Sequence, residues 1–294
     1  MKTKNYFIGL ATAIWLFGLV SLTSCEKDKE LSAEAEEIAD DQMLIDNTFE
    51  SIGNDIDAAE AFISSDFKAA GDSCPLITEK LSNDTTIITI DFGDGCPQYV
   101  YNRYGKVIDT IVRKGQIIIK RQGRFREKNS FRIVILKDFY INGIKIEATR
   151  TIENMGKDNQ NRMYFKISVQ NGKITTPDGI VMTYNTERYR YWIKGESTPS
   201  PWDDEFAVIG SANGVTAFGE EYQLRIIDTL RIQNACRFIV KGKIETTVGN
   251  REPITIDYGN GECDNIATIS CGDASKQIML RFRAREKARR ILKR

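Results

Sequence analysis

The stretch Met163-Tyr164-Phe165-Lys166-Ile167-Ser168-Val169 alternates apolar and polar side chains with a period of two residues. This period is typical of a strand with one buried and one exposed face. Similar short runs fill the chain from Thr85 onward, without a long helical period between them, which argues against parallel βαβ units. The runs are separated by turn signals, including Asn-Gly or Asp-Gly pairs at 142–143, 171–172, 178–179 and 260–261. We therefore predict a mainly β fold over residues 73–282: a large antiparallel meander of roughly 12 to 14 strands that forms a sandwich or barrel-like roll.

One strand-and-turn unit occurs twice in this region. Residues 88–95 and 254–261 are identical at six of eight positions, and a cysteine follows each copy. The two copies are candidates for pseudo-equivalent strands. Acidic side chains around them are possible Ca²⁺ ligands, but Asp and Asn before Gly also serve hairpin turns, which is the interpretation we favour: Asp91, Asp94, Asp257 and Asp264.

The amino-terminal segment has the layout of an export signal. Lys2 and Lys4 precede an apolar run over 6–22, and Leu22-Thr23-Ser24-Cys25 then leads into charged residues. This ending resembles the lipobox of bacterial lipoproteins. The resemblance implies that residues 1–24 are removed, that Cys25 carries the lipid anchor, and that 25–31 form a tether. The alternative is a transmembrane helix with an incidental cysteine.

The two turns that follow the repeated strands carry a second resemblance. Residues 91–96 read as the end of an IDFG-x-GC turn and residues 256–265 as IDYG-x-G-x-CDN. The pair is similar to turns in a family of uncharacterised, β-rich outer-membrane lipoproteins of Bacteroidota, and the similarity covers about residues 70–280. It implies a β-rich fold and an outer-membrane location, and it implies no activity. The charged residues 26–30 just after Cys25 resemble the export signal that sends many such lipoproteins to the cell surface, with the periplasmic face as the alternative.

An acidic helix is expected between the tether and the β region. Apolar residues recur at helical spacing: Ile38, Ile45, Phe49, Ile52, Ile56, Ala59 and Ile63. The pattern predicts a helical segment within 32–72 that begins near Ser32 and stops before Gly71. Its acids lie mostly off the stripe, so we expect one exposed face. We favour packing of the stripe on the same chain over a coiled coil with another chain.

The cysteines after residue 25 are expected to form disulfides, because the chain is exported. Cys74 with Cys96 and Cys236 with Cys263 are the favoured pairs, and Cys271 is left over. Cys263 with Cys271 is the rival pair. A cysteine zinc site is disfavoured because the sequence has no C-x-x-C motif.

Charge and composition exclude several classes of function. Lys and Arg number 41 against 41 Asp and Glu, and the absence of histidine removes Ser-His-Asp triads and His-bearing zinc sites. The balance conceals two extremes: residues 26–66 carry 14 acids and two lysines, and residues 281–294 carry eight basic residues and one acid. We expect a basic tail over 283–294, no cofactor and no nucleic-acid partner.

The densest aromatic and acidic stretch is the candidate ligand site. It comprises Tyr189, Tyr191, Trp192, Trp202, Asp203 and Asp204. Such groups can stack on a sugar and hydrogen-bond its hydroxyls. The structural alternative is that Trp192 is a core residue and that Trp202 fixes a proline-flanked loop. We expect a membrane-anchored, non-catalytic binding or envelope structural protein with a glycan or protein ligand. The alternatives are a carrier of lipid in a β cavity and, less favoured, a carboxylate hydrolase.

Overall fold

A computed structural model describes residues 30–64, 74–101, 107–236 and 238–280. The expected signal peptide over 1–24, the lipid anchor at Cys25 and the basic tail over 283–294 lie outside these ranges. Among the described helical residues, none forms a stretch long and apolar enough to cross a membrane.

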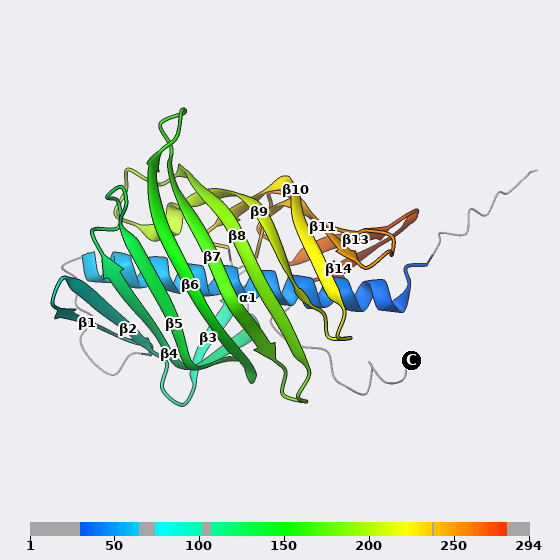
Figure 1. Ribbon diagram of the computed structural model, residues 1–294, viewed down its shortest axis with the longest axis horizontal. Coiled ribbons are helices and arrows are strands. Elements are labelled where there is room, and N and C mark those ends of the chain that lie inside the picture. The colour runs from blue at the N-terminus through cyan, green and yellow to red at the C-terminus, as the bar shows by residue number, and fades with distance from the viewer. Residues whose placement is uncertain (1–29, 65–73, 102–106, 237, 281–294) are drawn as a thin grey trace, which may run out of the picture.

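The described part is one helix and one antiparallel sheet of 14 strands, which confirms the mainly β meander (Figure 1). Consecutive strands pair along the whole path, except that β3 pairs with one half of the long strand β4 and β2 pairs with the other half. The elements are α1 (Ala33–Ser64), β1 (Leu76–Ser82), β2 (Thr85–Asp91), β3 (Cys96–Tyr101), β4 (Val107–Gln122), β5 (Phe131–Ile141), β6 (Ile144–Lys157), β7 (Met163–Thr175), β8 (Val181–Lys194), the short 3₁₀ helix η1 (Pro201–Asp203), β9 (Glu205–Val215), β10 (Glu221–Gln233), β11 (Lys241–Val248), β12 (Ile254–Asn260), β13 (Ile266–Cys271) and β14 (Ala274–Met279).

Bulges at glycines interrupt the register where the sheet bends. Gly115 in β4 has a φ of +82°, and a Cβ there would lie 2.0 Å from the carbonyl oxygen of Asp138 in β5. Gly210 in β9 meets the carbonyl oxygen of Glu187 in β8 in the same way, at 2.3 Å. Because the strands approach so closely, only glycine fits at these two positions, and the sheet curves into an open trough around α1 (Figure 1).

The helix fills the trough rather than lying on its surface. Ser32 caps its first turn, because the Ser32 Oγ accepts a hydrogen bond from the backbone N–H of Ala35 at 3.2 Å. Every residue from 41 to 53 is buried, so both the apolar stripe and the opposite side of the helix contact the sheet. The stripe does pack on the same chain, but the expectation of an exposed acidic face is wrong: Glu37, Asp41, Asp46, Glu50 and Glu60 are buried.

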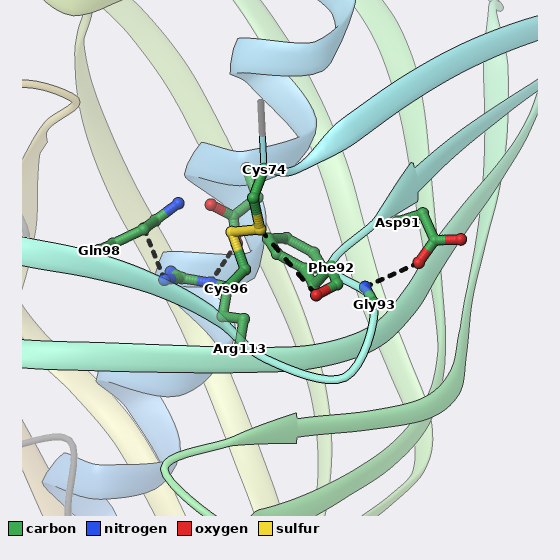
Figure 2. Close-up of a disulfide and its surroundings, with 8 residues drawn as sticks. Cys74, Asp91, Phe92, Gly93, Cys96, Gln98 and Arg113 are labelled. Carbon is green, nitrogen blue, oxygen red and sulfur yellow. Dashed lines mark hydrogen bonds and ion pairs between the residues drawn. A yellow bond between two sulfur atoms is a disulfide. The ribbon is translucent and has the colours of Figure 1, made fainter. Parts of the chain in front are cut away.

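Two disulfides tie loops to the trough. Cys74 is bonded to Cys96 and Cys236 to Cys263, each with a Cα–Cα distance of 5.7 Å, and Cys271 is a free thiol. These are the favoured pairs of the sequence analysis, and the rival pairing of Cys263 with Cys271 is not formed. The first bond lies against the C-terminal half of α1 (Figure 2).

Candidate functional site

Ion pairs between arginines of the sheet and acids of the helix occupy the interior of the trough. Arg188 of β8 contacts Asp46 Oδ1 at 2.5 Å and Glu50 Oε1 at 3.4 Å. Two to three turns further along α1, Asp57 pairs with Arg190 at 3.0 Å, and Glu60 pairs with Arg132. Alternation along a strand explains why these arginines point inward: 188 and 190 share a face with Trp192, which is 3% exposed.

Burial and charge act against each other in this row of ion pairs. Burial raises the pKa of Asp46 above its ordinary value, although the Arg188 guanidinium opposes the rise. Burial alone would lower the pKa of Arg188, but the carboxylates of Asp46 and Glu50 outweigh it and raise that pKa. We therefore expect the row to fix the register of α1 within the sheet, because a shifted helix would leave buried charges without partners.

Arg113 extends the row beside the first disulfide (Figure 2). Its side chain is fully buried, donates to Gln98 Oε1 at 2.6 Å and forms an ion pair with Asp55 Oδ2 at 2.8 Å. The same guanidinium donates to Ser51 Oγ of α1 at 2.5 Å. Strand β3, which begins at Cys96, is therefore tied to Cys74 by the disulfide, and its Gln98 contacts Arg113 of β4, which in turn contacts the helix.

A loop over residues 195–204 crosses the trough near the C-terminal end of α1. Ser200 caps η1 by accepting from the backbone N–H of Trp202, and Thr198 donates to Asp203 Oδ1 at 2.8 Å. Arg126 donates to the carbonyl oxygens of Glu196 and Thr198. The loop is therefore held by hydrogen bonds at both ends, and Trp202 projects from it with 60% of its surface exposed.

Two clefts use this loop as a shared wall. The Trp202 cleft has a volume of about 510 Å³, and the Trp192 cleft has a volume of about 760 Å³. Both are lined by Ala61, Pro199 and Pro201. The residues that set the chemistry of the Trp202 cleft are Asn54, Asp55, Gln98, Arg113, Trp202 and Asn234. Those of the Trp192 cleft are Asp57, Glu60, Arg121, Arg124, Trp192 and Asp204.

The Trp202 cleft combines an exposed aromatic face with amide and carboxylate oxygens. Asn54 Oδ1 is buried in its lining without a hydrogen-bond partner in the described part of the chain. Such an acceptor is unusual in a folded interior. Asn234, which also lines this cleft, accepts from Arg190 Nη2 at 3.2 Å, which fixes its amide.

The Trp192 cleft contains an acid of raised pKa. Asp204 Oδ1 accepts from Trp192 Nε1 at 3.0 Å, and burial raises the pKa of Asp204 to about 7, with the charges of Asp57 and Asp203 adding to the rise. The other carboxylates are committed to arginines: Asp57 to Arg190, and Glu60 to Arg132 and Arg121. Asp57, Glu60 and Asp204 therefore do not form a pair of acids that is free to exchange protons with a substrate.

The structure divides the sequence-predicted ligand residues into three places. Trp192 and Asp204 lie inside the trough, and Trp202 and Asp203 lie on the loop. Tyr189 and Tyr191 face outward from β8, where Tyr191 stacks on Tyr164 with ring centroids 5.1 Å apart. The tyrosines are thus not brought together with the tryptophans, because odd and even residues of β8 point to opposite faces.

Each of the two repeated turns is held by its own aspartate, whose side chain accepts from a backbone N–H of the turn. Asp91 Oδ1 accepts from the N–H of Gly93 at 2.8 Å, and Asp257 Oδ1 accepts from that of Gly259 at 2.9 Å. The Gly93 hydrogen bond, with help from Gln116, lowers the pKa of Asp91. Within the described residues, no group of three or more acids or cysteines is arranged to hold a metal ion. These contacts support the conformational interpretation of the aspartates.

Sequence reasoning missed Asn54, Arg190 and Asn234. Arg190 had a usable signal, because it shares the parity of Trp192 and of Arg188 on β8. The two asparagines had none, since only the folded loop brings them to the same cleft.

Comparisons with protein-family models, curated proteins and solved structures gave no match for this chain.

Proposed function

We propose that the protein is an exported lipoprotein, anchored to the outer membrane through Cys25, whose β domain is a non-catalytic glycan-binding module. The observation that carries the binding proposal is the Trp202 cleft. Trp202 offers an exposed indole face, and the lining adds the amides of Asn54, whose buried Oδ1 has no partner among the described residues, and of Asn234, which Arg190 fixes. An aromatic face with hydrogen-bonding groups around it suits a sugar ring with its hydroxyls.

The anchor and its location rest on the lipobox resemblance. The similarity to β-rich Bacteroidota lipoproteins supports the outer membrane and the cell surface. A palmitate analogue tests the anchor: we expect Cys25→Ala to abolish lipid labelling, and unchanged labelling would overturn the assignment.

Binding in the Trp202 cleft is favoured over carriage of a lipid. A carrier needs an apolar cavity, but α1 fills the trough, and the interior facing it holds charged pairs such as Arg188 with Asp46. It is also favoured over hydrolysis, because the carboxylates of Asp57 and Glu60 are held by arginines in the Trp192 cleft.

A glycan screen on the chain from residue 25 onward, with Cys25→Ser, tests the ligand class. This chain has two tryptophans, Trp192 and Trp202, so intrinsic fluorescence reports on the cleft. We expect Trp202→Ala to weaken binding of any hit at least tenfold, as loss of a stacking aromatic does at interfaces. Tyr189→Ala on the outer face is the matched aromatic control and should bind as the parent does.

Two results would contradict the proposal. The first is a screen without a glycan ligand. The second is a hit whose affinity falls with Tyr189→Ala and not with Trp202→Ala, which would move the site to the convex face. Asn54→Ala, which removes the unpartnered acceptor, should weaken the same hit severalfold without changing the fold.

A further inference from the structure

The Trp192 cleft contains two arginines whose charge no acid of the described chain neutralises. Arg124 and Arg126 lie in the loop between β4 and β5, and both line the cleft. The Arg124 side chain is exposed and forms no ion pair with a described residue. Glu127, an acid of the same loop, is held by the backbone, because its Oε2 accepts from the N–H of Arg124 at 3.2 Å. The guanidinium of Arg124 is therefore open to a ligand.

Arg126 is held in place without a carboxylate partner among the described residues. Its guanidinium donates to the carbonyl oxygens of Glu196 and Thr198, and its Cζ lies 4.9 Å from the centroid of the Trp192 ring. Carbonyl oxygens and an aromatic face orient a guanidinium but leave its full charge in place. The Arg126 side chain also keeps further N–H donors, because these contacts do not use all of those that a guanidinium carries.

The acids of the cleft are already balanced or close to neutral. Asp57 and Glu60 pair with inward arginines of the trough, and Glu79 pairs with Arg121 at 3.2 Å. Asp204 is the remaining acid of the lining, and burial raises its pKa to about 7. At neutral pH it therefore opposes an anion less than a fully ionised acid would. The cleft as a whole has an excess of positive charge.

The size and the position of the cleft suit one part of a longer ligand. Its volume of about 760 Å³ lies within the range of about 300–1,000 Å³ that is typical of small-molecule pockets. It shares Ala61, Pro199 and Pro201 with the Trp202 cleft, so the two clefts are neighbours. An oligosaccharide that stacks on Trp202 can therefore place another of its sugars in the Trp192 cleft.

We propose that the glycan of the proposed function, on which this inference rests, is acidic, and that the carboxylate or sulfate group of one of its sugars binds to Arg124 and Arg126 in the Trp192 cleft. Two oxygens of such a group match the planar fork of a guanidinium in a bidentate pair. A neutral sugar makes no such pair and leaves both charges uncompensated. The Trp202 cleft then supplies stacking, and the Trp192 cleft selects for charge.

Pairs of saccharides that differ only in charge test the ligand class. Oligomers of galacturonate, glucuronate and mannuronate are each compared with their methyl esters, and dextran sulfate is compared with dextran. Binding to the chain from residue 25 with Cys25→Ser is measured by calorimetry at low and high salt. We expect an acidic member to bind about tenfold or more tightly than its neutral partner, with the difference shrinking in high salt. The uronate and dextran arms tell a carboxylate from a sulfate.

Arg124→Gln is the variant that tests the site itself. We expect it to weaken binding of the acidic member about tenfold or more, as loss of a charge-assisted hydrogen bond does, and to leave a neutral hit unchanged. Arg225→Gln is the charge-matched control, because Arg225 pairs with Glu245 on other strands and its side chain is 72% exposed. It should alter the affinity less than about twofold, since exposed charges at a distance are screened. Equal losses in the two variants would overturn the site.

The outcomes separate this inference from the proposed function. A glycan that needs Trp202 but binds equally well with and without charge would overturn the acidic site and leave the Trp202 cleft intact. Binding that depends on charge and on Arg124, but not on Trp202, would overturn the Trp202 cleft and retain the acidic site. A panel without any ligand would overturn both.

Discussion

Arg188 lies between two carboxylates of α1 in the centre of the trough, and its replacement by methionine tests whether the ion-pair row fixes the helix. The side chains of Arg188 and Asp46 are 3% and 0% exposed. Arg188→Met keeps most of the volume and removes the guanidinium that pairs with the buried Asp46 and with Glu50. Breaking a buried pair from one side costs about 3–5 kcal/mol of unfolding free energy. We therefore expect a loss of that size in urea unfolding of the chain from residue 25 with Cys25→Ser.

Arg225→Met is the matched control for this change. Arg225 pairs with Glu245 at 2.7 Å, but its side chain is 72% exposed, and exposed pairs contribute about 0–1 kcal/mol. The double variant Arg188→Met with Asp46→Leu should recover much of the loss, because it removes the charge together with its partner. If Arg188→Met costs no more than Arg225→Met, the ion-pair row does not hold the helix in the trough.

The pH dependence of the Arg188→Met variant gives a second readout. Burial already raises the pKa of Asp46 in the parent, and loss of Arg188 raises it further. An acid with a raised folded pKa takes up a proton on folding, so stability increases as pH falls toward the unfolded pKa near 3.8. The loss caused by Arg188→Met should thus be smaller at pH 5 than at pH 8. An equal loss at both values would mean that Asp46 is not the group left unpaired.

Three further predictions concern the loop, the sheet and the disulfides. The pKa of Asp204 is raised to about 7, so ionised Asp204 destabilises the folded state at pH 8. Asp204→Asn should therefore stabilise the fold at pH 8 by about 1–2 kcal/mol, a figure reduced for solvent screening because the carboxyl borders a cleft. It should also flatten the dependence of stability on pH between pH 4 and 7. Thermal unfolding at both ends of that window measures this, and an unchanged profile would contradict it. Gly115→Ala should cost at least 3 kcal/mol in urea unfolding because its Cβ meets a carbonyl oxygen at 2.0 Å, whereas Gly179→Ala, at a positive φ of +83° with open space around it, should cost about 1 kcal/mol; equal costs would contradict the close approach. Cys96→Ser opens a bond between residues 22 apart and should cost about 3 kcal/mol, with Cys271→Ser nearly neutral in the same assay.

The mainly β fold follows from the sequence because alternation and turn pairs are local signals. The strand at Met163 and the hairpin at Asn142-Gly143 need no distant partner to be recognised, and the structure has both. The start of the helix at Ser32 is local in the same sense. The curvature of the sheet is not, because it depends on close approaches such as that of Gly115 to the facing strand.

The acidic helix shows where pattern reasoning fails. Acids off an apolar stripe normally face water, and Asp46 and Glu50 have no local feature that says otherwise. Their partner Arg188 lies on the inward face of β8, beside apolar residues such as Met182 and Trp192. It is therefore also a charged residue at a position where the strand pattern favours an apolar one. Only both anomalies together predict a buried ion pair, and 142 residues separate Asp46 from Arg188.

This separation has a consequence for how the chain acquires its fold. The helix segment precedes every strand in the sequence, whereas its partners in the ion-pair row lie between Arg113 and Arg190. A chain that emerges amino terminus first exposes an acidic, half-apolar segment long before β8 exists to receive it. Such long-range contacts make folding slow. We therefore expect the trough to close around the helix late in folding.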